Sequence, residues 1–344
     1  MAKQVAIGMQ SFDKVIEGNC FYIDKTWFIK EWWENKDEVT LITRPRRFGK
    51  TLTMSMVEQF FSINYAGRGD LFEGLSIWEA EKYRQLQGTY PVVFLSFADV
   101  KETGFENASY QICQNIKNQY EKYAFLQNSD VLSEAEKAYF REVTFEIKRE
   151  DVAFSLKKLS EFLYRYYGKK VIILLDEYDT PMQEAYVAGY WDEMVAMIRG
   201  FFNSSFKSNP YLERAIMTGI TRVSKESIFS DLNHLKVVTV TSDEYATAFG
   251  FTEEEVFCSL DEYGMSDEKE GVKRWYDGFT FGHDTDIYNP WSILNFLDTH
   301  GKYVSYWANT SSNSLVGKLM IIRRTLVTLV VSKAVLLENK TYVW

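Results

Sequence analysis

The chain has 344 residues, of which 46% are hydrophobic and 25% charged. This composition supplies a packed core and excludes an intrinsically disordered chain. The net charge of -9 argues against a protein that coats nucleic acid by bulk attraction, so nucleic acid is a possible partner only through a local basic patch. The length predicts one large α/β unit with a smaller one, or two comparable domains.

Cysteine usage and apolar runs bear on location. Cys20, Cys113 and Cys258 are odd in number and far apart, and the three histidines do not lie beside them at metal-ligand spacing. This pattern predicts reduced thiols, no structural zinc and a cytoplasmic location. The N-terminus lacks the apolar stretch of a signal peptide. The apolar run 326–340 is interrupted by Lys333 and is too short to cross a bilayer, so we predict no membrane span.

Short runs of consecutive apolar residues alternate with helical patterns. Such runs are typical of strands buried on both faces of a parallel sheet, and they lie at 38–43, 90–97, 170–177, 214–220 and 236–240. Apolar residues at helical spacing predict helices over 52–63 and 154–167. The fold class is therefore α/β, with three layers around a mostly parallel sheet.

The chain divides by composition. Thr252 before an acidic turn and Asn289 before Pro290 are helix-start signals in the region that follows the last strand. We predict an N-terminal segment packing on the core (1–35), the core itself (36–245, with a helical insertion at about 102–150), a small, mainly helical, lid-like domain (246–316) and a divergent or truncated tail (317–344).

The first chemical motif is "RPRRFGKT" at 44–51, between a strand and a helix. It matches the phosphate-binding pattern GxxxxGK[ST], the P-loop, except at its first glycine. Gly49 permits close backbone approach, Lys50 would reach the β- and γ-phosphates, and the Thr51 hydroxyl would ligate Mg²⁺. Arg44 with Pro45 could make the turn that the first glycine usually makes. Taken alone, "GKT" is a weak signal.

The second motif, "VIILLDEYD", strengthens the first. It predicts a buried strand ending at Asp176 and Glu177, a Walker B pattern in which Asp176 holds the Mg²⁺ shell and Glu177 polarises the attacking water. The alternative is a buried strand that ends in a solvated acidic turn. Because both motifs lie at carboxyl ends of strands, where open α/β sheets bind ligands, we favour a nucleotide site.

Three further groups have weaker assignments. In "MTGITR", Thr218 and Thr221 could contact the γ-phosphate or its water, and Arg222 could act as an arginine finger in cis or in trans; ordinary turn residues are the alternative. Arg46 and Arg47 could grip the nucleotide, a polyanion or the nearby carboxylates, or one of them could be solvated.

The sequence resembles a family of bacterial and archaeal AAA-ATPase-like proteins that commonly carry a C-terminal PD-(D/E)XK nuclease-like domain. The matching segments lie in the same order over most of 4–316, namely "FYIDKTWFI", "LITRPRRFGKTL", "YPVVFLSFADVK", "LLDEYDTPM", "MTGITRVSKESIFSDLNHL", "WYDGFTFG" and "IYNPWSILNFL". The resemblance implies that arginine at position 44 is a P-loop variant, and that an additional sensor strand lies between the P-loop and Walker B strands. It also implies signature positions at Asp24, Lys25 and Thr26 and at 275–278.

The expected function is an Mg²⁺-dependent ATPase that serves as a switch or motor for an associated nuclease-like activity. The alternatives are a non-hydrolysing, nucleotide-gated module that binds protein or nucleic acid, and an inactive truncated product. Nuclease activity in this chain is not expected, because the tail lacks an aspartate. A protein partner or self-association is possible. The predicted catalytic residues are Glu177, Lys50 and Arg222, the nucleotide-binding residues Arg44, Pro45, Arg46, Arg47, Phe48, Gly49, Lys50, Thr51 and Thr218, and the metal ligands Thr51 and Asp176.

Overall fold

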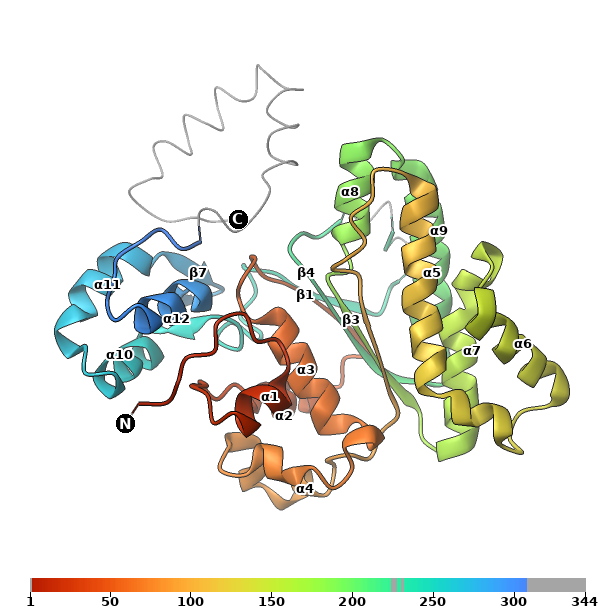
Figure 1. The fold of residues 1–344 in the computed structure, drawn as a ribbon, viewed down its shortest axis with the longest axis horizontal. Helices are drawn as coiled ribbons and strands as arrows, with labels where there is room; N and C mark the ends of the chain where they lie inside the picture. The colour runs from red at the N-terminus through yellow and green to blue at the C-terminus, as the bar shows by residue number, and fades with distance from the viewer. Residues whose placement is uncertain (1, 224–227, 230–231, 308–344) are drawn as a thin grey trace.

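A five-stranded parallel sheet forms the centre of the computed structural model, which describes residues 2–223, 228–229 and 232–307 (Figure 1). Its spatial order is β2-β3-β4-β1-β5. The bounds are β1 Val39–Thr43, β2 Val92–Ser96, β3 Val171–Asp176, β4 Leu212–Gly219 and β5 Leu235–Val238. All five strands overlap the apolar runs that predicted them, because parallel strands covered by helices are apolar on both faces.

β4 lies between β1 and β3, so the strand that carries "MTGITR" separates the two motif strands. The register pairs Thr43 of β1 with Gly219 of β4, and Ser96 of β2 with Asp176 of β3. These strands therefore end at one edge of the sheet, where the loops that follow them meet. This arrangement is the additional-strand order that the family resemblance implied.

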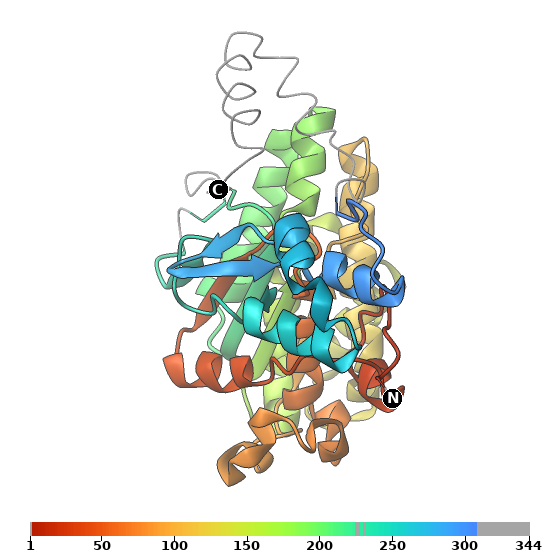
Figure 2. The same ribbon diagram turned by 90° about the vertical axis from the view of Figure 1, so that its left-hand side faces the viewer.

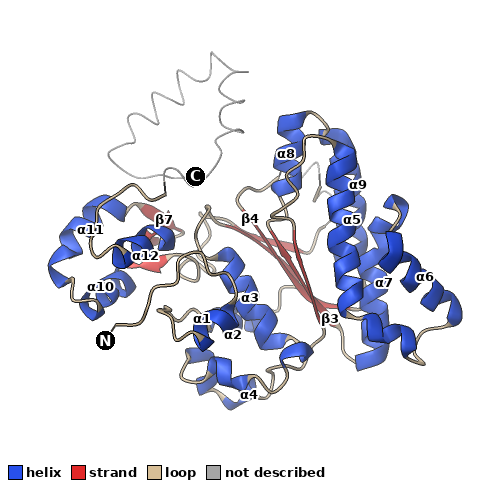
Figure 3. Cartoon of the chain, viewed as in Figure 1, coloured by secondary structure: helices blue, strands red, loops and turns tan. Residues whose placement is uncertain are grey.

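Helices cover both faces of the sheet (Figure 3). The first face packs against α5 Phe105–Lys122, α7 Arg149–Tyr167 and α9 Trp191–Phe202, with α6 Glu134–Glu146 outermost. Leu41, Ile173 and Met217 lie in this core, whereas their neighbours Ile42 and Ile172 lie in the core of the other face, as the alternation of a strand requires. The predicted insertion therefore includes α5, which packs directly on the sheet.

The opposite face is covered by the N-terminal segment and by the helix that follows the loop 44–49. These elements are α1 Phe12–Glu17, α2 Trp27–Asn35, α3 Lys50–Phe61 and α4 Glu81–Arg84. Trp32, Phe60 and Phe61 of these helices are fully buried. The segment 1–35 thus shares its apolar core with α3 and with the sheet.

Residues 246–307, which we call the small region, stand beside the carboxyl edge of the sheet and in front of it in Figure 2. They form a three-stranded antiparallel sheet, β6 Phe251–Thr252, β7 Phe279–Phe281 and β8 Asp284–Tyr288, with α10 Glu253–Glu262, α11 Lys269–Tyr276 and α12 Pro290–Asp298. Helices predominate, but the small sheet was not expected. Thr252 and Asn289 cap α10 and α12, as the helix-start signals predicted.

The remaining regular element at the carboxyl edge is α8 Thr180–Ala188, which begins just after the acidic motif. Within the described ranges, no helix combines the length and apolar character that crossing a bilayer requires. The tail predicted at 317–344, with its apolar run, lies outside the described residues.

Candidate functional site

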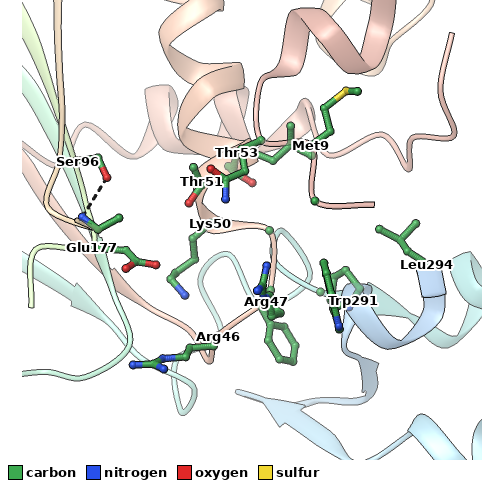
Figure 4. Close-up of a pocket in the computed structure, with 18 of the residues that line it drawn as sticks. Met9, Arg46, Arg47, Lys50, Thr51, Thr53, Ser96, Glu177, Trp291 and Leu294 are labelled. Carbon is green, nitrogen blue, oxygen red and sulfur yellow. Dashed lines mark hydrogen bonds between the residues drawn. The ribbon is translucent and has the colours of Figure 1, made fainter. Parts of the chain in front are cut away.

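A cavity of about 680 Å³ opens at the carboxyl edge of the sheet. Its lining comes from the loop 46–53, from the strand ends at Ser96 and Glu177 with the loop 98–101 and the start of α8, and from the N-terminal segment and the small region. In Figure 4, Lys50 and Glu177 point toward one another, whereas Trp291 and Leu294 lie together on another side. The cavity wall is therefore polar and charged beside the sheet and mostly apolar away from it, with Lys25 as a charged exception.

The predicted phosphate loop ends where α3 begins. Gly49 is the N-cap residue of α3 and has φ 80°, a left-handed conformation that glycine adopts without a Cβ penalty. The buried Lys50 ammonium donates hydrogen bonds to the carbonyl oxygens of Arg44 (3.1 Å) and Pro45 (2.9 Å). Burial lowers the pKa of Lys50, an effect that the nearby carboxylates of Glu177 and Asp176 oppose.

Asp176 joins the two motifs. Its carboxylate accepts a hydrogen bond from the Thr51 hydroxyl at 2.7 Å and another from the Thr218 hydroxyl at 2.5 Å. Burial raises the pKa of Asp176, while the two hydroxyl donors act in the opposite direction. The structure thus brings together three residues from α3, β3 and β4 that sequence reasoning placed in one site.

These oxygen donors are chemically suited to Mg²⁺. A hydroxyl and a carboxylate are hard ligands, and Mg²⁺ in nucleotide sites typically takes one or two protein ligands besides water and phosphate oxygens. The hydrogen bond between Thr51 and Asp176 shows that the two side chains converge. Among the described residues there is no group of three or more His, Cys, Asp or Glu side chains that could hold a metal without such outside ligands.

Glu177 follows Asp176 in an unusual backbone conformation. Its φ of 50° is left-handed, which costs energy for a residue with a side chain. The half-buried carboxylate lines the cavity and accepts a hydrogen bond from the Thr180 hydroxyl at 3.2 Å. The turn therefore directs Glu177 toward the space in front of Lys50, where an attacking water could be bound.

Arg44 lies away from the cavity. Its guanidinium is fully buried and donates to the carbonyl oxygens of Thr43 (3.0 Å), Thr239 (2.8 Å) and Tyr245 (3.2 Å). It also lies over the Phe281 ring at 4.8 Å, within cation–π range. Its side chain thus holds the start of the loop to the segment after β5, a role different from the predicted contact with nucleotide.

The other bulky residues of the loop contact the small region. The guanidinium of Arg47 lies 4.3 Å from the centre of the Trp291 ring, and the Arg46 carbonyl accepts from Asn289. Phe48 is buried against the aromatic rings of β7. Arg46, Arg47 and Phe48 line the cavity as well, whereas Pro45 is not among the described residues that line it.

The loop after β4 is organised by Asp179, a residue that sequence analysis did not single out. Its carboxylate accepts from the backbone N–H groups of Ile220 (3.0 Å) and Thr221 (2.7 Å) and from the Thr221 hydroxyl (2.8 Å). Burial raises the pKa of Asp179. Thr221 is therefore engaged with Asp179, and neither it nor the exposed Arg222 occurs among the described residues that line the cavity.

Lys25 is a second residue whose role the sequence did not reveal. Its ammonium is buried at the cavity wall and pairs with Glu255 at 2.5 Å, and it also donates to the Thr247 carbonyl at 2.8 Å. Asp24 meanwhile accepts from the Thr26 backbone N–H and hydroxyl. Lys25 thus fastens the N-terminal segment to α10, whereas Asp24 and Thr26 accept from the backbone N–H groups of Ser76 and Ile77. The sequence does not show that Lys25 and Glu255 form an ion pair, because the two residues lie 230 positions apart.

The fold and the site together define a P-loop nucleoside-triphosphatase core. A strand inserted between the motif strands, a lysine at the start of α3 and a carboxylate at the end of β3 are its distinguishing features. The family model described as "Predicted AAA-ATPase" matches residues 6–229, and the chain belongs to this family. Membership supports nucleotide binding and an ATPase-like function.

A curated relative matches almost the whole chain. It is an "Uncharacterized protein in vnfD 5'region" of Azotobacter chroococcum mcd 1, 26% identical over 326 residues that make up 94% of this chain and 57% of the relative. The chain therefore spans little more than half the length of this relative.

Proposed function

We propose that the protein binds ATP with Mg²⁺ and hydrolyses it to ADP and phosphate. The observation that carries this proposal is the convergence of Thr51, Asp176 and Thr218 through two hydrogen bonds beside the buried Lys50. Lys50 would exchange its carbonyl partners for phosphate oxygens and neutralise their charge. The apolar part of the cavity, at Met9 and Leu294, would receive the base.

In the proposed reaction Glu177 acts on water. Its carboxylate would accept a hydrogen bond from the water that attacks the γ-phosphorus, and it would orient the oxygen for in-line displacement of ADP. Thr51 and Asp176 would hold Mg²⁺, which supplies charge neutralisation on the phosphates. Thr218 would fix the orientation of the Asp176 carboxylate through its hydroxyl.

Arg222 supports a role for a second molecule. Its side chain is exposed and lies outside the cavity lining of its own chain, so of the two arginine-finger modes the trans mode fits the geometry better. We propose that copies of the protein associate when ATP is bound. We also propose that turnover moves the small region against the core and switches an associated nuclease-like activity.

The test is nucleotide binding and turnover of the purified chain. Thermal unfolding with ATP and Mg²⁺ should show a concentration-dependent rise in the midpoint, and Lys50→Ala should abolish that rise. Phosphate release should depend on Mg²⁺. An unchanged midpoint for the wild type with ATP, GTP and Mg²⁺ would overturn the proposal, whereas binding without phosphate release would favour the non-hydrolysing module.

A further inference from the structure

The small region holds the phosphate loop by its backbone. The Arg46 carbonyl accepts one hydrogen bond from the Asn289 side-chain amide at 3.3 Å and another from the Trp307 indole N–H at 3.2 Å. Asn289 is 2% exposed. Both donors lie more than 240 positions away in sequence, so the shape of the loop is determined partly by a distant segment.

Side chains of the loop make a second set of contacts with the same region. Arg47 stacks on Trp291 at 4.3 Å, and Phe48 lies 4.8 Å from Phe279, centre to centre. Gly250 leaves room for Phe48, because a Cβ at position 250 would lie 3.0 Å from the Phe48 ring. Three consecutive loop residues are thus each seated on the small region.

The loop needs this external support for a conformational reason. Arg47 has φ 69°, a left-handed conformation. Glycine adopts this conformation freely, whereas it is unfavourable for a residue with a side chain such as arginine. A strained backbone conformation of this kind is maintained only when contacts from the surrounding structure hold it in place. The sequence has no glycine between positions 44 and 48, so contacts from outside must replace the intrinsic turn preference.

We propose that Asn289 and Trp291 are positioning residues for the phosphate loop, holding Arg46 and Arg47 in the conformation that directs the loop toward the phosphates of a nucleotide. The inference depends on the proposed function for the identity of the ligand. The effect of Asn289 and Trp291 on the conformation of the loop does not depend on it. The small region is then a wall of the phosphate site as well as a cover for the base. Because coupling is reciprocal, phosphate binding should in turn strengthen the attachment of the small region.

The first test needs no nucleotide. Trypsin cleavage after Arg46 and Arg47, followed by mass spectrometry, reports how often the loop opens. Asn289→Asp and Asn289→Ser keep a side-chain oxygen for the cap that Asn289 gives α12. An ionised aspartate has no donor for the Arg46 carbonyl, and the serine hydroxyl is a donor on a shorter side chain that does not span the 3.3 Å contact of the Asn289 amide. Trp291→Leu removes the ring, and Trp291→Phe restores one. Trp275→Leu is the matched control, an exposed tryptophan of the same region.

We expect the rate of cleavage after Arg46 and Arg47 to rise about 2- to 10-fold for the Asn289 variants, because loss of one hydrogen bond makes opening of the loop more favourable by that factor. Trp291→Leu should raise it about 2- to 5-fold, the worth of an exposed cation–π contact, and Trp291→Phe should largely reverse this. Trp275→Leu should leave it unchanged. Equal cleavage in wild type and all variants, with unchanged rates at other sites, would overturn the inference.

The second test separates the phosphates from the base. Affinities for ATP and for inorganic tripolyphosphate, measured with Mg²⁺ by calorimetry, should fall by similar factors of about 2 to 10 in Asn289→Ser and Trp291→Leu. Loss of ATP affinity alone would show that Trp291 contacts the base and would overturn its positioning role. If the wild type binds neither ligand, the proposed function fails, while the cleavage test still decides the positioning role.

Discussion

The two halves of the site are built in different ways. The strand-end half consists of Asp176, Glu177, Thr218 and Asp179, and the hydrogen bonds of Asp176 and Asp179 run between adjacent strands and the loops that follow them. The loop half consists of residues 44–48, which are anchored by carbonyl oxygens, side-chain N–H donors and aromatic rings from 239–307. A parallel sheet fixes the first half by its register, whereas the second half depends on how a separate region packs.

This difference predicts different responses to mutation. A change to Glu177, whose half-buried carboxylate faces the cavity, should alter chemistry with little effect on folding. Changes in the loop half should alter stability or affinity, because they release contacts between regions. Of the four experiments that follow, in order of decreasing expected effect, the first two compare the two halves, and the last two measure structural contacts outside both.

Glu177→Gln should lower phosphate release by about 10² to 10⁴-fold, the usual contribution of a positioned base. The amide fills the same space as the carboxylate but cannot accept a proton from water. ATP binding and the unfolding midpoint should stay close to those of the wild type, measured by calorimetry and thermal unfolding. Full turnover in this variant would mean that hydrolysis does not use Glu177.

Arg44→Ala should destabilise the fold by about 2–4 kcal/mol, since it leaves buried carbonyls without donors and removes the contact with Phe281. Denaturant unfolding measures the loss, and Arg46→Ala is the comparison, because Arg46 is bonded through its backbone carbonyl. If Arg44→Ala kept full stability and lost only ATP affinity, Arg44 would be a nucleotide contact after all.

Lys25→Met should lower the free energy of unfolding by about 2–3 kcal/mol. The Glu255 carboxylate, whose side chain is 25% exposed, would lose its ion-pair partner, and breaking a buried pair on one side leaves an uncompensated charge. Partial solvation of Glu255 keeps the loss below that of a fully buried pair. Urea unfolding of Lys25→Met and of Lys25→Met/Glu255→Gln checks this, and the double variant should recover part of the loss.

Glu136→Gln lies outside both halves and sets the scale for an ordinary structural contact. Glu136 caps α6 and pairs with Arg165 at 2.7 Å, which lowers the pKa of Glu136 to about 2. A depressed carboxyl pKa stabilises the fold above the unfolded value near 4.5, and this stabilisation disappears as pH falls toward 2. The variant should therefore lose about 1 kcal/mol at pH 7 and match the wild type near pH 2. If the variant were still less stable than the wild type at pH 2, the difference would come from the packing of the side chain at position 136 and not from its charge.

Sequence patterns predicted the architecture because the physical signals are local. Consecutive apolar residues predicted all five strands, and cap residues such as Thr252 predicted helix starts. The grouping of Lys50, Thr51, Asp176 and Thr218 also followed from sequence, since each stands at a strand end or helix start. The small sheet, formed by 251–252 and 279–288, was missed because its strands are short and none is a run of consecutive apolar residues.

Local patterns were enough to specify which residues stand at the carboxyl edge of the sheet, because period, strand ends and helix starts are encoded over a few positions. Which groups Arg44 and Arg47 contact was decided only by the packing of distant segments. The Arg44 guanidinium is buried among carbonyl groups, one of them on Tyr245, 201 positions away, and Arg47 stacks on Trp291. Both contacts join the loop to segments far away in the sequence. Such contacts depend on the packing of one region against another, which no local pattern expresses.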